Sequence, residues 1–130
     1  MDDLVAFLRA RLDEDERIAR AVPVVKGCAP PAHWDTGADL GGKNHWVLGT
    51  SNDIDAHTAE AAEHIARHDP AHVLGDIEVK RRMISQCEKF LAGQGDKLMW
   101  QASNLARRIL ADLTLPYADH REYREEWRSR

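Results

Sequence analysis

Four long stretches of the chain repeat their apolar residues every three or four positions, and this helical period constrains the fold more than any other feature. In the first stretch the apolar residues fall on one face of a helix. That face consists of Leu4, Val5, Leu8, Leu12, Ala19 and Val22. We predict a helix over residues 2–22, with Asp2 or Asp3 as its N-cap and Pro23 as its stop.

Three further helices are predicted over residues 53–68, 70–91 and 96–113, followed by a charged tail over residues 114–130. The Ser51-Asn52-Asp53 cluster indicates the start of the second helix, and Asp69-Pro70 is typical of an N-cap followed by proline at the first helical position. Gly93-Gln94-Gly95 indicates a turn, after which Asp96 caps the next helix. We expect the third and fourth helices to pair antiparallel. The expected inward face of the fourth is Leu98, Ala102, Leu105, Ile109 and Leu113.

Residues 23–52 lack a helical period because glycines and Pro30-Pro31 interrupt them. Two His-Trp pairs, His33-Trp34 and His45-Trp46, flank a turn-rich segment, which favours a short β-hairpin that packs on the helices. The predicted fold is therefore a single mainly α domain over residues 1–130. It is a bundle of about four helices with a small irregular or β-hairpin insertion after helix one.

Composition narrows the function classes. The chain has 130 residues and a net charge of −4, which disfavours nonspecific binding to nucleic acid. No apolar run is long enough to span a membrane, and the acidic start resembles no export signal. Cys28 and Cys87 form neither a disulfide framework nor a cysteine zinc motif. We expect a cytoplasmic protein in a reducing compartment.

The first candidate site is a row of histidines. His57, His64 and His68 fall within about 40° of one another on the predicted second helix, and the i, i+4 pair has the spacing of helical zinc ligands. This pattern fits a zinc-binding protein or a small metal-dependent hydrolase. Histidines at the border of a solvated helix face give the same pattern, and the H-E-x-x-H order of a zinc protease is absent.

The second candidate site is a pair of basic clusters on the third and fourth helices. A nucleic-acid-binding regulator would use these side chains on its phosphate-facing surface. They are Lys80, Arg81, Arg82, Arg107 and Arg108. Acidic residues are interleaved with them, and such charge runs are usually solvated faces.

The third candidate site is aromatic. Trp34, Trp46 and Trp127, together with Tyr123, have the composition of a partner-binding surface. The alternative is that Trp34 and Trp46 cover the helical core while Trp127 clamps the tail.

Three blocks of sequence resemble a family of small uncharacterised proteins from actinobacteria such as streptomycetes and from their phages. These are residues 3–16 (DLVAFLRARLDEDE), 64–74 (HIARHDPAHVL), and 115–120 (LPYADH) with 123–127 (YREEW). The family is one of unknown function, so the resemblance implies no activity. This chain lacks the family's Pro-Gly-Pro-Trp element after helix one and the cysteine-bearing insertion between the third and fourth helices.

No catalytic motif is present, which favours a protein that is not an enzyme. The leading hypothesis is a protein-interaction module, either an adaptor or a homo-oligomer, that makes contacts through its amphipathic first and third helices and its aromatic tail. The alternative hypotheses are a metal-binding protein and a nucleic-acid-binding regulator.

Overall fold

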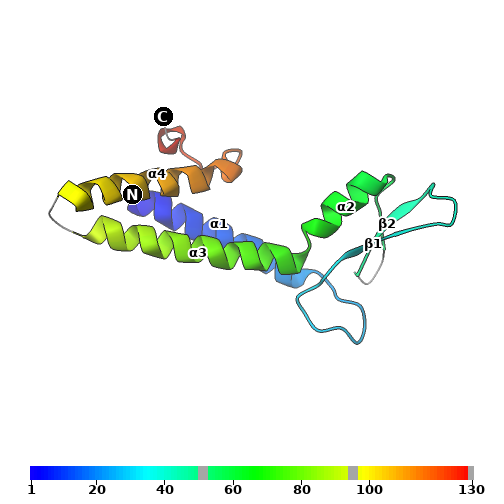
Figure 1. Cartoon of the computed structure of the whole chain (residues 1–130). Helices are drawn as coiled ribbons and strands as arrows, with labels where there is room; N and C mark the ends of the chain where they lie inside the picture. The colour runs from blue at the N-terminus through cyan, green and yellow to red at the C-terminus, as the bar shows by residue number, and fades with distance from the viewer. Residues whose placement is uncertain (50–52, 94–96, 129–130) are drawn as a thin grey trace. The chain divides into compact units, whose positions relative to one another are not determined.

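The computed structural model describes residues 1–49, 53–93 and 97–128 (Figure 1). The chain divides into two compact units. Unit 1 comprises Met1–Glu14 and Glu78–Arg130, and unit 2 comprises Asp15–Ile77. The expected mainly α fold with a small β insertion is confirmed, whereas the single-domain organisation stays a prediction. The predicted cap at Ser51-Asn52 and the predicted turn and cap at 94–96 lie outside the described residues.

Three long helices form most of unit 1. They are α1 (Asp2–Ala21), α3 (Pro70–Ala92) and α4 (Lys97–Thr114), of which α1 and α3 extend into unit 2. Each end agrees with the sequence prediction to within one residue. Figure 1 shows α4 running back along α3, as expected for an antiparallel pair. No helix in the described part of the chain is long and apolar enough to cross a membrane.

The core of unit 1 is built from apolar faces of these helices. Its largest fully buried side chains are Leu8, Leu12, Ile84, Leu110 and Thr114. The prediction that Leu105 points inward is wrong, because that side chain is 59% exposed while its neighbours Ala106 and Leu110 are buried. The buried face of α4 is thus rotated by about one residue, or 100°, from the predicted one.

The C-terminal tail packs on α1 through aromatic rings. It contains two short 3-10 helices, Leu115–Tyr117 and Glu125–Trp127. The buried Phe7 ring has its centroid 5.0 Å from that of Trp127 and 6.3 Å from those of both Tyr117 and Tyr123. These edge and tilted contacts add to apolar burial, so the tail is part of unit 1.

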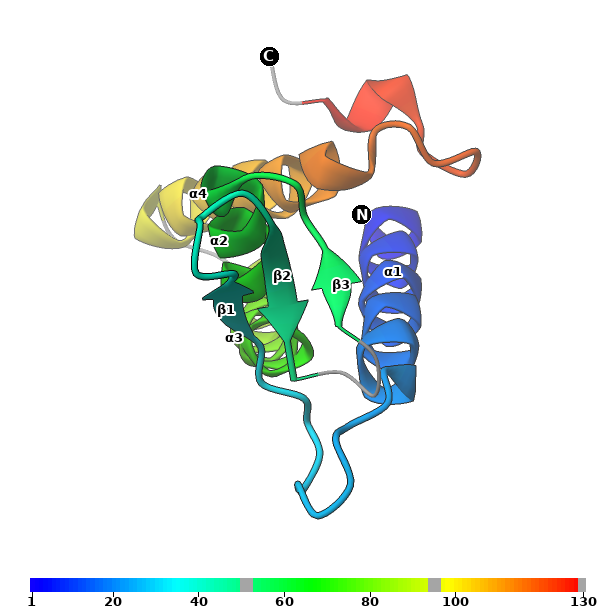
Figure 2. The same cartoon turned by 90° about the vertical axis from the view of Figure 1, so that its right-hand side faces the viewer.

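Unit 2 contains a three-stranded antiparallel sheet in the order β1 (Asp35–Ala38), β2 (His45–Leu48) and β3 (Ile54–Asp55) (Figure 2). The predicted hairpin is confirmed, and β3 is an addition that the sequence did not indicate. Val47 on the central strand is fully buried and forms a small core with Ala56 and Ala62, against which Trp34 packs.

The second helix, α2 (Ala59–Arg67), begins six residues later than predicted. Thr58 is its N-cap, and the Thr58 hydroxyl accepts a hydrogen bond from the Ala61 amide at 3.1 Å. His57 precedes the cap with a left-handed backbone, φ 62°, so it lies outside the helix. The predicted start at residue 53 is wrong because Ile54 and Asp55 pair with β2 instead.

Candidate functional site

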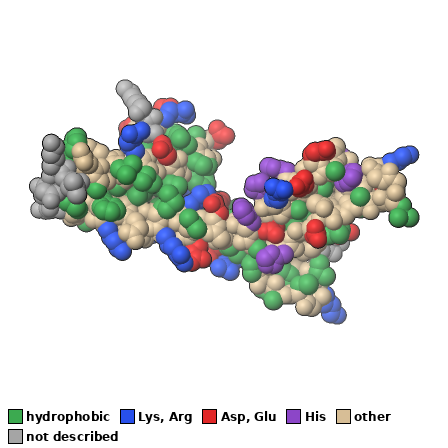
Figure 3. Space-filling view, in the orientation of Figure 1, with side chains coloured by type: hydrophobic (Ala, Val, Ile, Leu, Met, Phe, Trp, Pro, Cys, Tyr) green, Lys and Arg blue, Asp and Glu red, His purple; other side chains and the backbone are tan. Residues whose placement is uncertain are grey.

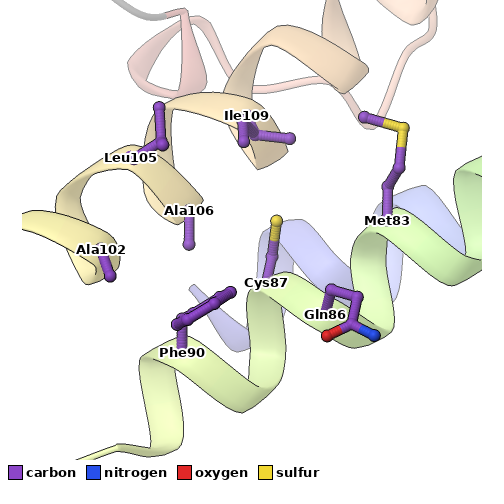
Figure 4. Close-up of a pocket in the computed structure, with 8 residues that line it drawn as sticks. All are labelled: Met83, Gln86, Cys87, Phe90, Ala102, Leu105, Ala106 and Ile109. Atoms are coloured by element: carbon purple, nitrogen blue, oxygen red, sulfur yellow. The ribbon is translucent and has the colours of Figure 1, made fainter. Parts of the chain in front are cut away.

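The most distinctive surface of unit 1 is an apolar groove between α3 and α4. Figure 4 shows the side chains that line it, and its cavity volume is about 240 Å³. The lining residues are Met83, Gln86, Cys87 and Phe90 from α3 and Ala102, Leu105, Ala106 and Ile109 from α4. We call this surface the α3–α4 face. Gln86 is the single polar side chain among them.

Large apolar side chains of the α3–α4 face remain exposed. Met83 is 38%, Phe90 44% and Leu105 59% exposed, and Val79, one turn before Met83 on the same side of α3, is 53% exposed. The spacing of residues 79, 83, 86 and 90 repeats the four-three-four pattern of a coiled-coil contact stripe. Figure 3 shows hydrophobic side chains (green) on the part of the molecule that holds these helices. Such a stripe on a surface marks an interaction site.

Cys87 lies at the base of the groove and is 5% exposed. Burial raises the pKa of its thiol above the ordinary value, so the side chain is protonated at neutral pH. It therefore contributes as a small apolar group rather than as a nucleophile.

A second feature, in unit 2, is a row of histidines where α2 meets α3. The ring centroids of His64 and His68 are 4.5 Å apart, and those of His68 and His72 are 5.9 Å apart. Figure 3 shows histidine side chains (purple) gathered on this part of the molecule. Of the predicted stripe, the structure brings His64 and His68 together but leaves His57 apart, beside Asp55 at 3.6 Å. The third histidine of the row is therefore His72 rather than His57.

The tautomer of His68 is fixed by its neighbour. Its Nδ1 lies 2.7 Å from the backbone carbonyl oxygen of His64. A carbonyl oxygen only accepts, so Nδ1 carries the proton and Nε2 keeps its lone pair. In the described part of the chain, however, no three His, Cys, Asp or Glu side chains are grouped so that they could hold a metal ion.

Asp69 anchors the same region. Its carboxylate accepts hydrogen bonds from the backbone amides of Trp34 at 3.0 Å and His72 at 2.7 Å. The second bond is that of an N-cap for α3, as Asp69-Pro70 predicted. The first bond ties the segment before β1 to the start of α3.

The five basic residues predicted to bind nucleic acid lie on α3 and α4 of unit 1, in different surroundings. Arg81 pairs with Asp13 on α1 at 2.6 Å, and Arg82 pairs with Glu78 one turn before it. Arg107 and Arg108 line a hollow of about 250 Å³ together with Trp127. Lys80 is partly buried on α3. Nucleic-acid binding stays a prediction.

The aromatic residues predicted to bind a partner fall in both units. Trp34 and Trp46 are half-buried in unit 2, where Trp34 covers the small core. Tyr123 and Trp127 contact each other in unit 1, with ring centroids 5.9 Å apart. Trp34, Tyr123 and Trp127 contribute to packing, while partner binding by the four residues stays a prediction.

Sequence reasoning missed the α3–α4 face because it assigned Leu105 to the core, whereas the side chain is exposed. The signal was present in the sequence. Residues 102, 105 and 109 on α4 and residues 79, 83 and 90 on α3 form apolar stripes in addition to those that the core uses. A helix that packs against one core needs one apolar stripe, so a second apolar stripe on the same helix indicates a second contact surface.

Comparison with known proteins identifies the family and nothing further. Residues 1–129 match DUF6221, a family of unknown function, so the chain belongs to that family. No protein with curated annotation and no solved structure matches the chain.

Proposed function

Since the family assigns no activity, we propose from the surface itself that this protein is a non-enzymatic interaction module that self-associates through the α3–α4 face. The observation that carries the proposal is the exposed apolar stripe Val79, Met83 and Phe90 beside Leu105. Pairing this stripe with an identical one removes apolar surface from water, the main driving force of association.

The stripe on α3 is complementary to itself. When a two-fold axis crosses α3 between Gln86 and Cys87, Met83 of one copy lies opposite Phe90 of the partner subunit, and the reverse contact forms by symmetry. Methionine sulfur against an aromatic ring is a favourable contact. Gln86 lies beside the axis, where its amide can donate to and accept from the same amide of the second copy. A polar residue within an apolar stripe fixes register.

The exposed area is sufficient for a dimer. Taking about 150–200 Å² for each fully accessible residue, the exposed fractions of Val79, Met83, Phe90 and Leu105 amount to roughly 350 Å² in each copy. Two copies bury about twice that apolar area. Because interfaces are only about 60% apolar, the total reaches roughly 1,200 Å², the lower end of specific interfaces.

The test is the oligomeric state of a matched pair of variants, measured by sedimentation equilibrium. Leu105→Glu places a charge within the face, whereas Trp100→Glu makes the same change on the same helix at a side chain that is 66% exposed and does not line the groove. We expect a wild-type dimer, at least a hundredfold weaker association for Leu105→Glu because a charge is costly to bury, and an unchanged dimer for Trp100→Glu.

A wild-type protein that remains monomeric at about 100 µM (a dimer free energy weaker than about −5.5 kcal/mol) would overturn the proposal. So would equal weakening by both variants, because the α3–α4 face would then not be the contact. Far-UV circular dichroism of the two variants checks that both fold.

The proposal includes the setting that the sequence implies. It places the protein in the cytoplasm, which the two free cysteines support. We also propose that members of the family occur in actinobacteria and in their phages, as the sequence resemblance implies.

A further inference from the structure

We infer that a basic hollow in unit 1 binds a mononucleotide, a ligand that joins a phosphate group to an aromatic base. The hollow has a volume of about 250 Å³, and segments far apart in the sequence converge on it. We call it the arginine hollow. Its lining includes Leu4 from α1, Arg107, Arg108 and Ala111 from α4, and Trp127 and Arg128 from the tail.

This inference is independent of the proposed self-association, because the arginine hollow and the α3–α4 face share no lining residue. The hollow uses residues 107, 108 and 111 of α4, whereas the face uses residues 102, 105, 106 and 109. At 100° per residue, the two sets are centred about 160° apart around the helix. A ligand in the hollow therefore leaves the α3–α4 face accessible.

Two arginines of the hollow carry charge that no carboxylate neutralises. Six other arginines of unit 1 each form an ion pair with a carboxylate, namely Arg9, Arg11, Arg81, Arg82, Arg124 and Arg128. In the described part of the chain, Arg107 and Arg108 form no such pair, and both are exposed. Their like charges repel each other, and an anion bound between them removes that repulsion.

The whole lining keeps a positive balance. Arg128 adds a third guanidinium, whose Nε pairs with Glu125 at 2.7 Å. Among the described lining residues, Glu126 is the one glutamate beside these three arginines, which leaves a net charge of +2, and it lies 3.7 Å from Arg124. The planar fork of an arginine can bind two phosphate oxygens at once. The hollow is therefore suited to a phosphate group.

Trp127 supplies an aromatic surface in the same hollow. Its ring is held by Phe7 and Tyr123, with centroids 5.0 and 5.9 Å away, so its position is fixed before a ligand binds. The buried Leu4 and Ala111 add apolar atoms to the lining. Bases of every kind stack on aromatic side chains. Arginines beside a tryptophan fit a phosphate joined to a base, whereas free phosphate would use the arginines alone.

The size and the charge favour one nucleotide over a nucleic-acid strand. Sites for small ligands measure about 300–1,000 Å³. The arginine hollow shares Met1 and Arg107 with a second hollow of about 380 Å³, into which a ligand can extend. Asp2 and Glu88 line the second hollow, so the phosphate belongs in the first. The net charge of −4 on the chain opposes the binding of a longer polyanion.

The experiment is isothermal titration calorimetry of the full chain with AMP, inorganic phosphate and adenosine. We expect AMP to bind at least tenfold more tightly than phosphate or adenosine, because only AMP contacts both the arginines and Trp127. Its affinity should fall as NaCl is raised from about 10 mM to about 0.3 M, since salt screens exposed charges.

Two double variants locate the charge that matters. Arg107→Gln, Arg108→Gln should bind AMP at least tenfold more weakly than the wild type. The control, Arg82→Gln, Arg121→Gln, removes the same two charges from exposed side chains of unit 1 that do not line the hollow, and it should bind as the wild type does. Far-UV circular dichroism checks that both variants fold.

Nuclear magnetic resonance of the indole N–H groups locates the base. The Trp127 signal, assigned with Trp127→Phe, should shift more on addition of AMP than those of Trp34, Trp46 and Trp100, which do not line the hollow.

Four results would overturn the inference. One is AMP binding no tighter than about 1 mM. The others are equal affinity for AMP and inorganic phosphate, equal losses in the two double variants, and a single strand of about ten thymidine nucleotides that binds more than tenfold more tightly than AMP, because a nucleic acid would then be the ligand.

Discussion

The two units of this protein are stabilised in different ways. Of the six largest fully buried side chains in the described structure, unit 1 supplies five and unit 2 supplies only Val47. Unit 2 instead carries alanines in its core, three short strands, and carboxylates that accept backbone hydrogen bonds, such as Asp69 and Asp39. Six of the seven histidines are also in unit 2.

This difference shows that apolar burial and polar interactions are concentrated in different units of the chain. Unit 1 has more apolar surface than its core can bury, and the excess forms the α3–α4 face. Unit 2 also exposes apolar side chains, among them Ile18 and Leu40, but in the described structure they do not line a groove with one another as those of the α3–α4 face do. Unit 1 thus carries the α3–α4 face, and unit 2 carries most of the histidines.

The largest expected effect is on the core of unit 1. Leu110→Ala removes a fully buried side chain and leaves a cavity, so we expect the free energy of unfolding to fall by about 2–5 kcal/mol. Val47→Ala removes two methyl groups from the smaller core of unit 2 and should cost about 1–2.5 kcal/mol. Urea unfolding followed by circular dichroism measures both. A loss for Val47→Ala as large as that for Leu110→Ala would show that the two cores do not differ as described.

The next effect compares the two cysteines, one in each unit. Cys28 is exposed, whereas Cys87 is buried and burial raises the pKa of its thiol. Since the thiolate is the reactive form, iodoacetamide should modify Cys28 at least tenfold faster than Cys87 in the folded protein. Mass spectrometry of peptides after timed labelling gives the two rates. Comparable rates would mean that the groove opens readily, and equal labelling in urea serves as the control.

The smallest effect is a pH dependence in the turn between β1 and β2. The backbone amide of Lys43 donates to the Asp39 carboxylate at 2.8 Å, and both the side chain and the backbone amide of Asn44 donate to it as well. These bonds, with that from Lys43 the largest cause, hold the pKa of Asp39 below its ordinary value of 3.8. Because the folded pKa is lowered, the stabilising contribution is complete above pH 3.8 and is lost as the pH falls through the folded value.

A carbon-detected NMR titration of the Asp39 carboxyl measures this directly. The midpoint should lie below 3.8, and the amide signals of Lys43 and Asn44 should shift with it. A midpoint at or above 3.8 would show that these hydrogen bonds do not form in solution.

The helical part of the fold was predictable because its information is local. Period, capping residues and prolines located α1, α3 and α4 to within one residue. The start of α2 was not, since Asp53 looks like a cap only until Ile54 and Asp55 pair with β2. That pairing is a contact between two segments of the chain. It cannot be predicted from the helical period of one segment alone.

The candidate site was harder to predict for a related reason. Period 3.6 shows that α4 has an apolar stripe at residues 102, 105 and 109, but it does not show whether the stripe meets the core or solvent. The choice depends on Ala106 and Leu110, which pack inward and leave Leu105 outside. Similarly, His57 shares a helical projection with His64 only when the helix extends to it, and Thr58 caps the helix first.

The division of the chain into units also sets an order for synthesis. Unit 2 is one continuous segment that is available once residue 77 has been made, whereas the first turns of α1 must wait for residues 78–130. Until then Phe7 lacks Tyr117, Tyr123 and Trp127, the rings that surround it in the finished protein. On the ribosome, unit 2 therefore has all of its residues first, and the packing of the tail on Phe7 is completed last.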